Sequence, residues 1–387
     1  MTNLKQLLTE KCPKGIEYVK LGEVCTITKG KTPIQKAIPG EYPLVVTTSE
    51  RKSCNTYQFD NAAVCIPLVS SRGHGVASLN HVYFQSGKFA LGNILCAVIP
   101  NDENILSANF LFHYLEYKKD TLLVPLMKGG ANVSLHIDDI QRVKIPLPPV
   151  EIQSKIIEIL DKFVELSEVL SKELTARKKQ YEYYKYCLFQ SCSVFNSVNT
   201  TLITTDRFWL MPATPNYIEK GVPYITSKNV RNGKIDFSNV QYISSDDYEE
   251  ISKNRKIIKN DLLITMIGTI GETAFVEDYT DFYGQNIYLI RIDESICLRK
   301  YFYYFLSQET VKKGLISRKN ASSQGYIKAG SIENLSFPLP PIKEQERIVS
   351  ILDRFDKLCN DISEGLPAEI EARRKQYEYY RDKLLSF

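Results

Sequence analysis

Apolar residues recur at alternating steps of four and three along two segments of the chain. In the first segment they are Ile152, Ile156, Ile159, Phe163, Leu166 and Leu170, followed by Leu174, Tyr181, Tyr184 and Leu188. In the second they are Ile348, Ile351, Phe355, Leu358 and Ile362, followed by Leu366, Ile370, Tyr377, Tyr380 and Leu384. This spacing predicts long helices with a narrow coiled-coil seam. At ~1.5 Å per residue, a helix over 152–188 is roughly 55 Å long, and the other segment is its natural antiparallel partner.

The two segments are copies of one repeat. IPLPPVEIQSKIIEILDKFVELSEVL begins at Ile145 and FPLPPIKEQERIVSILDRFDKLCNDI begins at Phe337, and their tails are ARKKQYEYY from Ala176 and ARRKQYEYY from Ala372. The offset between the copies grows from 192 to 196 residues, so the second copy carries four extra residues near Gly365 and Pro367. Four residues are close to one helical turn, which predicts a stutter that returns the seam to the same face, with Pro367 as a candidate kink.

A region with strand-like runs precedes each repeat. Apolar runs between Gly, Pro, Asn and Asp clusters predict strands over 42–47, 94–99, 222–226 and 287–292, and aromatic helices over 109–117 and 299–307. We therefore predict an α+β protein in which two mixed α/β bodies are separated by a long antiparallel two-helix coiled coil formed by the internal repeats. The predicted boundaries are 1–145 and 196–337 for the bodies, and 146–195 and 338–387 for the helical repeats.

Composition narrows the class of protein. The formal net charge is only +4 over 387 residues, so binding to nucleic acid would depend on local basic clusters. Nine cysteines without a C-x-x-C pair indicate reduced thiols used as small apolar residues. No run approaches the ~18 apolar residues of a membrane span, and the N-terminus has no apolar signal-peptide core. These features predict a cytoplasmic protein with no membrane partner.

Motifs of catalysis are missing from the sequence. Gly30-Lys31-Thr32 is not a phosphate loop, because Cys25 stands where the first glycine is needed. G-x-G-x-x-G after a strand, H-E-x-x-H, G-x-S-x-G and an Asn-Pro-Pro-aromatic motif do not occur, and the four histidines are too scattered to predict metal. No catalytic or metal site is predicted. Two alternatives stay open, a site-specific nuclease or methyltransferase acting alone and a coiled-coil scaffold that binds only protein.

Polar and basic loops in the two bodies are the candidates for DNA contact, because Lys and Arg anchor phosphates while Arg, Asn and Gln read base edges. In the first body these residues are Lys29, Lys31, Thr32, Arg51, Lys52, Ser71, Arg72, His74, Lys128 and Asn132. In the second they are Lys228, Asn229, Arg231, Asn232, Lys234, Lys253, Asn254, Arg255, Arg318, Lys319, Asn320, Ser323 and Gln324. The basic tails at Arg177 and Arg373 are either phosphate contacts or a solvated helix face.

Several segments together resemble one known family. They are the opening CPKGIEYVKLGEV from Cys12, the two Pro-Leu-Pro-Pro stretches followed by Gln153 or Gln345, the ILDKF and ILDRF segments, and the KQYEYY tails. The turn from Met266 to Gly271 and its looser counterpart from Ser71 to Gly75 complete the set. With these the chain resembles, over essentially its whole length, the DNA-specificity (S) subunit of type I restriction-modification enzymes. One departure is that residues 196–214 lack the CPKG-type opening of the first body.

The resemblance implies a non-catalytic DNA reader. Two target-recognition domains each bind one half of a split site in double-stranded DNA, and the helical repeats act as a spacer. The same helices dock two methyltransferase (M) subunits, and restriction (R) subunits can join the complex. The chain itself is expected to bind no cofactor; S-adenosylmethionine, ATP and magnesium belong to the partner subunits.

Overall fold

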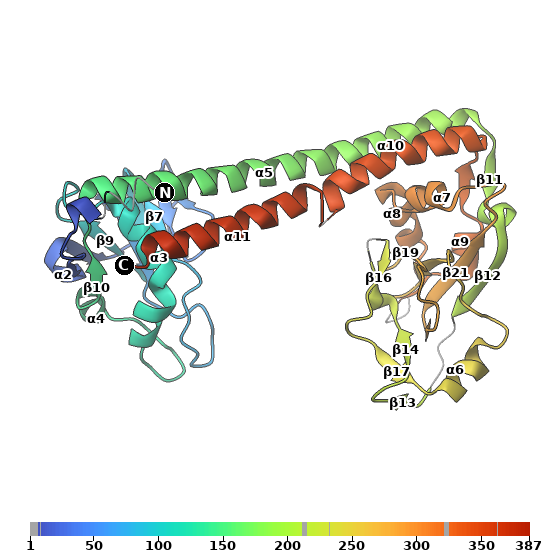
Figure 1. Cartoon of the computed structure of the whole chain (residues 1–387), viewed down its shortest axis with the longest axis horizontal. Coiled ribbons are helices and arrows are strands. Elements are labelled where there is room, and N and C mark those ends of the chain that lie inside the picture. The colour runs from blue at the N-terminus through green and yellow to red at the C-terminus, as the bar shows by residue number, and fades with distance from the viewer. Residues whose placement is uncertain (1–6, 8, 211–214, 232, 321–324, 362) are drawn as a thin grey trace. The chain divides into compact units, whose positions relative to one another are not determined.

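A computed structural model describes residues 7, 9–210, 215–231, 233–320, 325–361 and 363–387. The chain forms two compact units. Unit 1 contains Met1–Leu170 and Ile370–Phe387, and unit 2 contains Ser171–Glu369. Each unit therefore joins one α/β body to parts of both helical repeats, and the elements are labelled in Figure 1.

Unit 1 contains two small sheets. The first has the order β2-β9-β6-β7, with all neighbours antiparallel, and its strands are Cys25–Lys29, Leu95–Pro100, Ala63–Pro67 and Tyr83–Gln85. The second has the order β4-β3-β8-β5, formed by Lys52–Cys54, Tyr42–Val45, Lys88–Leu91 and Phe59–Asp60, and its β3 and β8 are parallel. The helices of the body are α2 (Leu21–Val24), α3 (Ala108–Leu122) and α4 (Ile137–Gln141). Strand β1 (Tyr18–Lys20) pairs with β10 (Lys144–Pro146), which leads into the first long helix.

Unit 2 repeats this arrangement. Its first sheet has the order β12-β21-β18-β19, formed by Thr204–Leu210, Ile287–Ile292, Leu262–Thr265 and Thr273–Phe275. Its second has the order β13-β17-β14-β20, formed by Tyr217–Ile218, Gln241–Ile243, Val222–Ile225 and Tyr283–Gly284, with β14 and β20 parallel. A hairpin of β15 (Val230–Arg231) and β16 (Lys234–Ile235) and the helices α6 (Ser245–Ser252), α7 (Arg299–Leu306), α8 (Glu309–Ser317) and α9 (Ala329–Glu333) complete the body. The mixed α/β class and the predicted strands and aromatic helices are confirmed.

Both bodies also begin alike, although their opening sequences differ. Strand β11 (Ser197–Asn199) pairs with β22 (Ser336–Pro338) just as β1 pairs with β10. The amide of Leu147 donates to the carbonyl of Glu17 at 2.8 Å, and that of Leu339 donates to Asn196 at 3.1 Å. These bonds involve only backbone atoms, so the second body keeps them without the CPKG-type opening.

Strands with apolar residues on both faces form the centre of each body. Every residue of β6 (AVCIP) and of β18 (LLIT) is buried, as expected for a strand covered on both sides. In unit 1 the helix α3 contributes Phe110 and Leu111 to the core, and in unit 2 the helix α7 contributes Tyr301 and Phe302.

A buried glutamine after each Pro-Leu-Pro-Pro stretch joins helix to body. Gln153 is fully buried; it accepts from the Ser107 amide at 2.9 Å and donates to the carbonyls of Ile105 at 2.8 Å and Pro148 at 2.7 Å. Gln345 repeats these contacts with Leu298 at 2.7 Å, Ile296 at 3.1 Å and Pro340 at 2.8 Å. In both units one side chain thus satisfies backbone groups of the loop before the aromatic helix and of the proline stretch.

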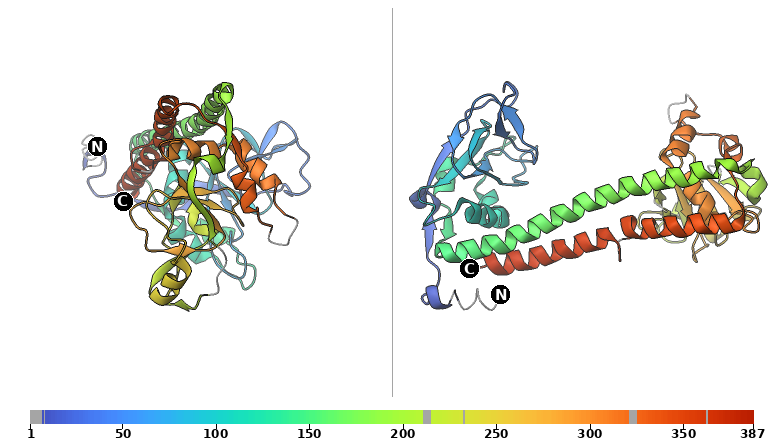
Figure 2. Two further views of the ribbon diagram at one scale, coloured as in Figure 1. Left: turned by 90° about the vertical axis from the view of Figure 1, so that its right-hand side faces the viewer. Right: turned by 90° about the horizontal axis from the view of Figure 1, so that it is seen from above.

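The predicted long helix is confirmed as α5 (Val150–Ser191), which is 42 residues long. The second repeat forms two helices instead, α10 (Ile342–Asn360) and α11 (Leu366–Leu385), seen as separate helices in Figures 1 and 2. The expectation of a continuous helix with a stutter is therefore wrong at this point. Asp361 accepts hydrogen bonds from the amide of Ser363 at 2.7 Å and from its hydroxyl at 2.5 Å, which closes a turn. Pro367 lies in the first turn of α11, where its missing N–H costs no hydrogen bond, and does not kink a continuous helix.

Matching aromatic contacts join the two repeats inside each unit. In unit 1 the ring of Phe163 stacks on Tyr380 at 5.3 Å and meets Tyr377 at 6.5 Å. In unit 2 the ring of Phe355 stacks on Tyr184 at 5.5 Å and on Tyr181 at 6.0 Å. A phenylalanine of one repeat therefore packs on the tail tyrosines of the other repeat in both units.

The exposure of the predicted seam residues varies along the helices. Ile156, Leu170, Tyr181 and Ile348 are buried; Ile159, Phe163, Ile351, Phe355, Tyr377 and Tyr380 are half-buried; Leu166, Tyr184 and Leu358 are exposed; and Ile362 lies outside the described residues. Leu160 and Leu352 are fully buried although they lie beside the predicted seam. Both belong to the cores of the bodies, so these helices bury a second stripe that a two-helix pattern does not include.

Candidate nucleic-acid interface

A row of backbone hydrogen bonds lines up several loops at one end of the first sheet of unit 1. The amide of Gly30, just after β2, donates to Leu95 at 2.9 Å; Leu68, just after β6, donates to Ile94 at 2.8 Å; and Leu135 donates to Leu68 at 2.8 Å. The segments after β2 and β6, before β9 and before α4 thus lie side by side. We call this set of segments the loop edge of unit 1.

Unit 2 builds the same row from different residues. The amide of Asn286, just before β21, donates to Leu210 at 2.9 Å; Met266, after β18, donates to Asn286 at 3.0 Å; and Ile327, before α9, donates to Met266 at 3.1 Å. Asn286 has a positive φ of 64°, a conformation that asparagine tolerates better than most residues. The loop edge of unit 2 is the set formed by the end of β12 at Leu210, the segment after β18, the segment before β21 and residues 325–328 before α9.

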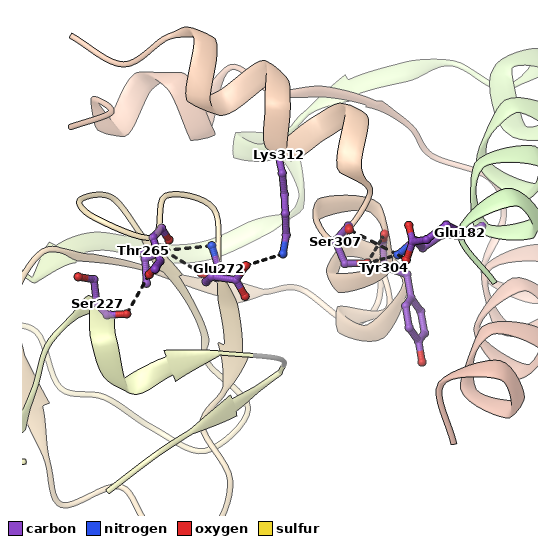
Figure 3. A network of polar contacts seen from close by, with 9 residues as sticks. Glu182, Ser227, Thr265, Glu272, Tyr304, Ser307 and Lys312 are labelled. Carbon is purple, nitrogen blue, oxygen red and sulfur yellow. Dashed lines mark hydrogen bonds and ion pairs between the residues drawn. The ribbon is translucent and has the colours of Figure 1, made fainter. Parts of the chain in front are cut away.

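The glycine turn between β18 and β19 is fixed to this edge. Gly268 and Gly271 have positive φ values of 71° and 81°, which only glycine adopts without strain. The buried hydroxyl of Thr265 donates to the carbonyl of Thr269 and accepts from the amide of Glu272 at 3.0 Å, and the Thr269 hydroxyl donates to the carbonyl of Ser227 at 3.1 Å. In Figure 3 these residues form one network that links the turn to the segment before β15.

An ion pair continues this network away from the turn. Lys312, on α8, extends toward Glu272 and forms an ion pair of 2.8 Å with its carboxylate (Figure 3). Elsewhere in unit 2, the ammonium of Lys185, on α5, lies 2.8 Å from Glu182 and 3.3 Å from the hydroxyl of Ser307; Glu182 and Ser307 are labelled in Figure 3. Lys185 is only 3% exposed and also lies 4.7 Å from the centre of the Tyr181 ring. The tail of the first repeat is therefore anchored to the body of unit 2.

The counterpart turn in unit 1 is the loop from Ser70 to Ser78, between β6 and β7. His74 and Gly75 have positive φ values, and a Cβ on Gly75 would lie 2.9 Å from the carbonyl oxygen of Gly130. Isolated bridges pair Val69 with Ser134 in this unit and Ile267 with Tyr326 in unit 2. The two turns thus occupy equivalent places, next to the segment that precedes the last short helix of each body.

Most of the predicted residues of unit 1 lie along its loop edge. Lys29, Lys31, Thr32, Ser71, Arg72, His74, Lys128 and Asn132 belong to the segments just described, and all but the half-buried Thr32 are exposed. The ammonium of Lys128 lies 3.1 Å from Asp139. Arg51 and Lys52 do not join them. The guanidinium of Arg51 donates to Gln85 at 3.1 Å and to the carbonyl of Phe84 at 3.2 Å, at the end of β7 that pairs with the start of β6.

The predicted residues of unit 2 fall into three groups. Lys228, Arg231 and Lys234 are exposed on the segment that Thr269 contacts and on the β15–β16 hairpin, and Lys253 and Asn254 are exposed after α6. Arg255, in the same group as Lys253, donates to the carbonyl of Trp209 at 3.0 Å. The third group follows α8: Arg318 donates to the carbonyl of Ser331 at 3.1 Å, Lys319 is exposed, and Asn320 accepts from the amide of Tyr326 at 2.8 Å. Asn232, Ser323 and Gln324 lie outside the described residues.

Asn229 has an internal structural role. Its side chain is 6% exposed, accepts from the amide of Thr226 at 2.9 Å and donates to the carbonyls of Asp236 at 2.9 Å and Asn239 at 3.2 Å. An amide with these partners has little capacity left for a base edge. The side chain of Asn229 therefore shapes the loop, and its contact with DNA stays a prediction.

Sequence reasoning missed an aromatic pair at the loop edge of unit 2. Trp209, next to the last residue of β12, stacks on Tyr326 with ring centres 6.1 Å apart. Both rings are half-buried, and the indole N–H of Trp209 is buried without a hydrogen-bond partner among the described residues. Trp209 is the single tryptophan of the chain, which is the only sequence signal that could have drawn attention to it.

The cysteines behave as apolar core residues. Burial raises the pKa of Cys25, Cys96 and Cys297 to about 12, so these thiols stay protonated at neutral pH. All nine are free, and within the described ranges no cluster of His, Cys, Asp or Glu has the geometry of a metal site.

Comparison with known proteins identifies the family. The model of the type I restriction modification DNA specificity domain matches residues 13–177 and 189–372. The specificity subunit of the EcoR124I/EcoR124II type I restriction enzyme of Escherichia coli is 33% identical over 72% of this chain and 71% of its own length. A putative type I restriction enzyme specificity subunit of Haemophilus influenzae is 29% identical over 96% of both chains. The chain therefore belongs to the family of type I restriction-modification DNA specificity proteins.

Solved structures agree at the level of the fold. The S subunit of a type I restriction-modification system from M. genitalium has a TM-score of 0.59 at 14% identity and covers 95% of this chain and 96% of its own. The HsdS subunit from Thermoanaerobacter tengcongensis has a TM-score of 0.51 at 18% identity, with 96% and 97% covered.

Among the described residues, none of the helices is both long enough and apolar enough to cross a bilayer.

Proposed function

We propose that this chain is the non-catalytic DNA sequence-specificity subunit of a type I restriction-modification complex, and that each loop edge binds one half of a split site in double-stranded DNA. The observation that carries this proposal is that both units build the same row of backbone hydrogen bonds and fill it with different polar and basic residues. A common frame with different side chains suits two different half-sites, because phosphate contacts fix position while base contacts carry sequence. We propose that the two target-recognition domains have the boundaries predicted from the sequence, 1–145 and 196–337.

The helical repeats over 146–195 and 338–387 are proposed to pair as an antiparallel coiled coil that sets the distance between the half-sites. Support comes from the matched contacts of Phe163 and Phe355 with the tail tyrosines of the other repeat. The tails also carry Tyr183 and Tyr379 at equivalent positions, 64% and 58% exposed. Because Tyr183 and Tyr379 are equivalent exposed aromatic side chains, each could form part of a docking site for one copy of the same partner protein.

Those partners are proposed to be two methyltransferase (M) subunits, joined by restriction (R) subunits in the cytoplasm. S-adenosylmethionine, ATP and magnesium would be bound by these partner subunits. The specificity chain would contribute DNA reading and geometry only.

Sequencing of methylated adenines in cells with and without this chain tests the function. We expect methylation at a split sequence that disappears when the chain is deleted, together with binding of the purified chain and its methyltransferase to that sequence in a salt-dependent manner. Methylation or cleavage by the purified chain alone would instead support the solitary-enzyme alternative. A chain that binds its protein partners but never duplex DNA would support the protein-only scaffold.

A further inference from the structure

A pocket of about 550 Å³ opens in unit 1 between two loops. One wall is the segment over 31–38, after β2, and the other is the loop over 54–58, which joins β4 to β5. The pocket continues from the loop edge: the amide of Thr32 donates to Leu91 at 3.1 Å, and its carbonyl accepts from Asn93 at 2.9 Å. Asn93 directly precedes Ile94, whose carbonyl belongs to the row of hydrogen bonds that defines the edge.

Hydrogen bonds across the pocket hold its two walls together. The side chain of Gln58 accepts from the amide of Lys31 at 2.8 Å and donates to the carbonyl of Lys29 at 2.9 Å. At the other end, the amide of Asn55 donates to the carbonyl of Ile38 at 2.9 Å. A Cβ on Gly40 would lie 2.4 Å from the Cα of Asn55, so the walls approach as closely as glycine permits. The pocket is therefore braced at both ends before any ligand arrives.

The lining favours an anion that also carries a flat apolar group. Lys31 and Lys36 are exposed, and the lining residues, all within the described part of the chain, include no carboxylate. The ring of Tyr57 is 46% exposed, and it is held by the ring of Tyr42 at 5.0 Å and by the ammonium of Lys88 at 5.1 Å from its centre. Two cations beside an accessible aromatic ring suit the sugar-phosphate backbone of duplex DNA, because the cations pair with a phosphate while the ring packs on the apolar face of the sugar.

We propose that this pocket holds one nucleotide of the bound DNA, at the margin of the half-site contacted by unit 1. Lys31 and Lys36 contact its phosphate, and Tyr57 packs against its sugar, because the bases of a duplex stay stacked inside the helix. The inference rests on the proposed function and deepens it, because it adds Lys36, Asn55 and Tyr57 to the DNA surface of unit 1. It also gives the first half-site a wider footprint than the loop edge alone provides.

The test uses the full-length chain with a labelled duplex that carries its mapped split site, titrated by fluorescence anisotropy at several salt concentrations. We expect Lys36→Ala to weaken binding several-fold and to reduce the slope of log affinity against log salt by about 0.9, the contribution of one phosphate contact. Tyr57→Leu should weaken binding several-fold because the contact of the ring with the sugar is lost, whereas Tyr57→Phe should bind like the wild type because it keeps the ring. Lys144→Ala, an exposed lysine on β10 of the same unit, is the charge-matched control and should leave affinity and slope unchanged.

Thermal melting of each variant shows that any loss of binding is not a loss of folding. The pocket assignment is overturned if the wild type binds its duplex and both Lys36→Ala and Tyr57→Leu bind with the same affinity and salt slope as the wild type. The proposed function would still stand in that case. A wild-type chain that fails to bind the mapped duplex would overturn the proposed function and the pocket with it.

Discussion

At the scale of single residues, both units use an aspartate of the helical repeat to join the repeat to the α/β body, but the residues that this aspartate contacts differ between the units. Asp161 accepts from Asn109 at 3.1 Å and lies 2.9 Å from the Nε2 of His113 on α3. Its counterpart Asp353 accepts from Lys300 at 2.7 Å and from the hydroxyl of Tyr304 at 2.5 Å on α7. The aspartates of the ILDKF and ILDRF segments thus explain part of the repeat: each fixes its helix to the aromatic helix of the adjoining body.

Gln153→Ala should destabilise unit 1. The substitution leaves the amide of Ser107 and the carbonyls of Ile105 and Pro148 without their partner. The Gln153–Pro148 bond is buried, and an unsatisfied buried group costs about 1–3 kcal/mol. We expect a lower midpoint in urea unfolding followed by circular dichroism. Gln190→Ala, at an exposed position of α5, is the matched control and should change little. Equal urea midpoints for the two variants would show that the hydrogen bonds of Gln153 do not stabilise unit 1.

His113 should make the stability of unit 1 sensitive to mild acid. Burial lowers the pKa of His113 below its ordinary value of 6.5, although Asp161 opposes the shift. Because the unfolded chain then binds a proton more readily than the folded chain, stability is lost as pH falls through about 6.5 and continues to fall until the folded pKa is passed. Melting temperatures measured from about pH 7.5 down to about pH 5.5 should show this loss. His113→Tyr, which copies Tyr304 of unit 2, should remove it, and an unchanged pH dependence in that variant would exclude His113 as the cause.

At the scale of elements, the break between α10 and α11 is the point where the two repeats differ. The four extra residues are absorbed in a turn that starts at Asp361, and the helix resumes at Leu366. Gly365 is required there, because a Cβ would lie 2.4 Å from the carbonyl oxygen of Lys357 and 2.7 Å from that of Asp361. The break therefore depends on the close packing of Gly365 against the last turn of α10.

Gly365→Ala should cost stability, about 1–3 kcal/mol for the clash with the backbone carbonyls. Gly314→Ala is the matched control, since Gly314 lies within α8 with open space around its Cβ position and alanine there should add about 0.5–1 kcal/mol. The two substitutions should move the urea midpoint in opposite directions. A stabilising effect of Gly365→Ala would show that the turn can close without glycine.

The helices and strands with a periodic apolar pattern could be predicted from the sequence, but contacts between residues that lie far apart in the sequence could not. The repeat and its seam predicted α5, and the apolar runs predicted β3, β9, β14 and β21, because both patterns are local. The burial of Leu160 and Leu352 escaped prediction because it depends on the body that packs beside the helix. At the candidate site, loop composition selected Arg72 and Lys128, which are exposed, but could not show that Arg51 is bound to β7 or that Asn229 is buried.

At the scale of the whole molecule, unit 1 is assembled from both ends of the chain. Leu384 and Leu385 belong to its core together with Phe110, and the hydroxyl of Tyr18 donates to the carbonyl of Phe387 at 3.1 Å. Unit 1 therefore cannot complete its core until Leu384 and Leu385 have been synthesised. Helix α5 contributes residues to both units, so a change in its length alters each unit.

If the helices set the distance between the half-sites, removing the four extra residues should alter the recognised sequence. Deletion of residues 363–366 removes the turn between α10 and α11 together with the first residue of α11. A spacer shortened by the ~6 Å rise of four helical residues would correspond to roughly two base pairs at ~3.4 Å each. We expect the unread spacer between the half-sites to shorten, or binding to be lost because the seam no longer matches α5. Methylated-adenine maps of cells that carry the deletion report the spacer directly, and Gly365→Ala, which perturbs the same turn without changing the length, should keep the wild-type spacing. A deletion variant that methylates sites of unchanged spacing would reject the helices as the ruler and leave the loop edges as independent readers.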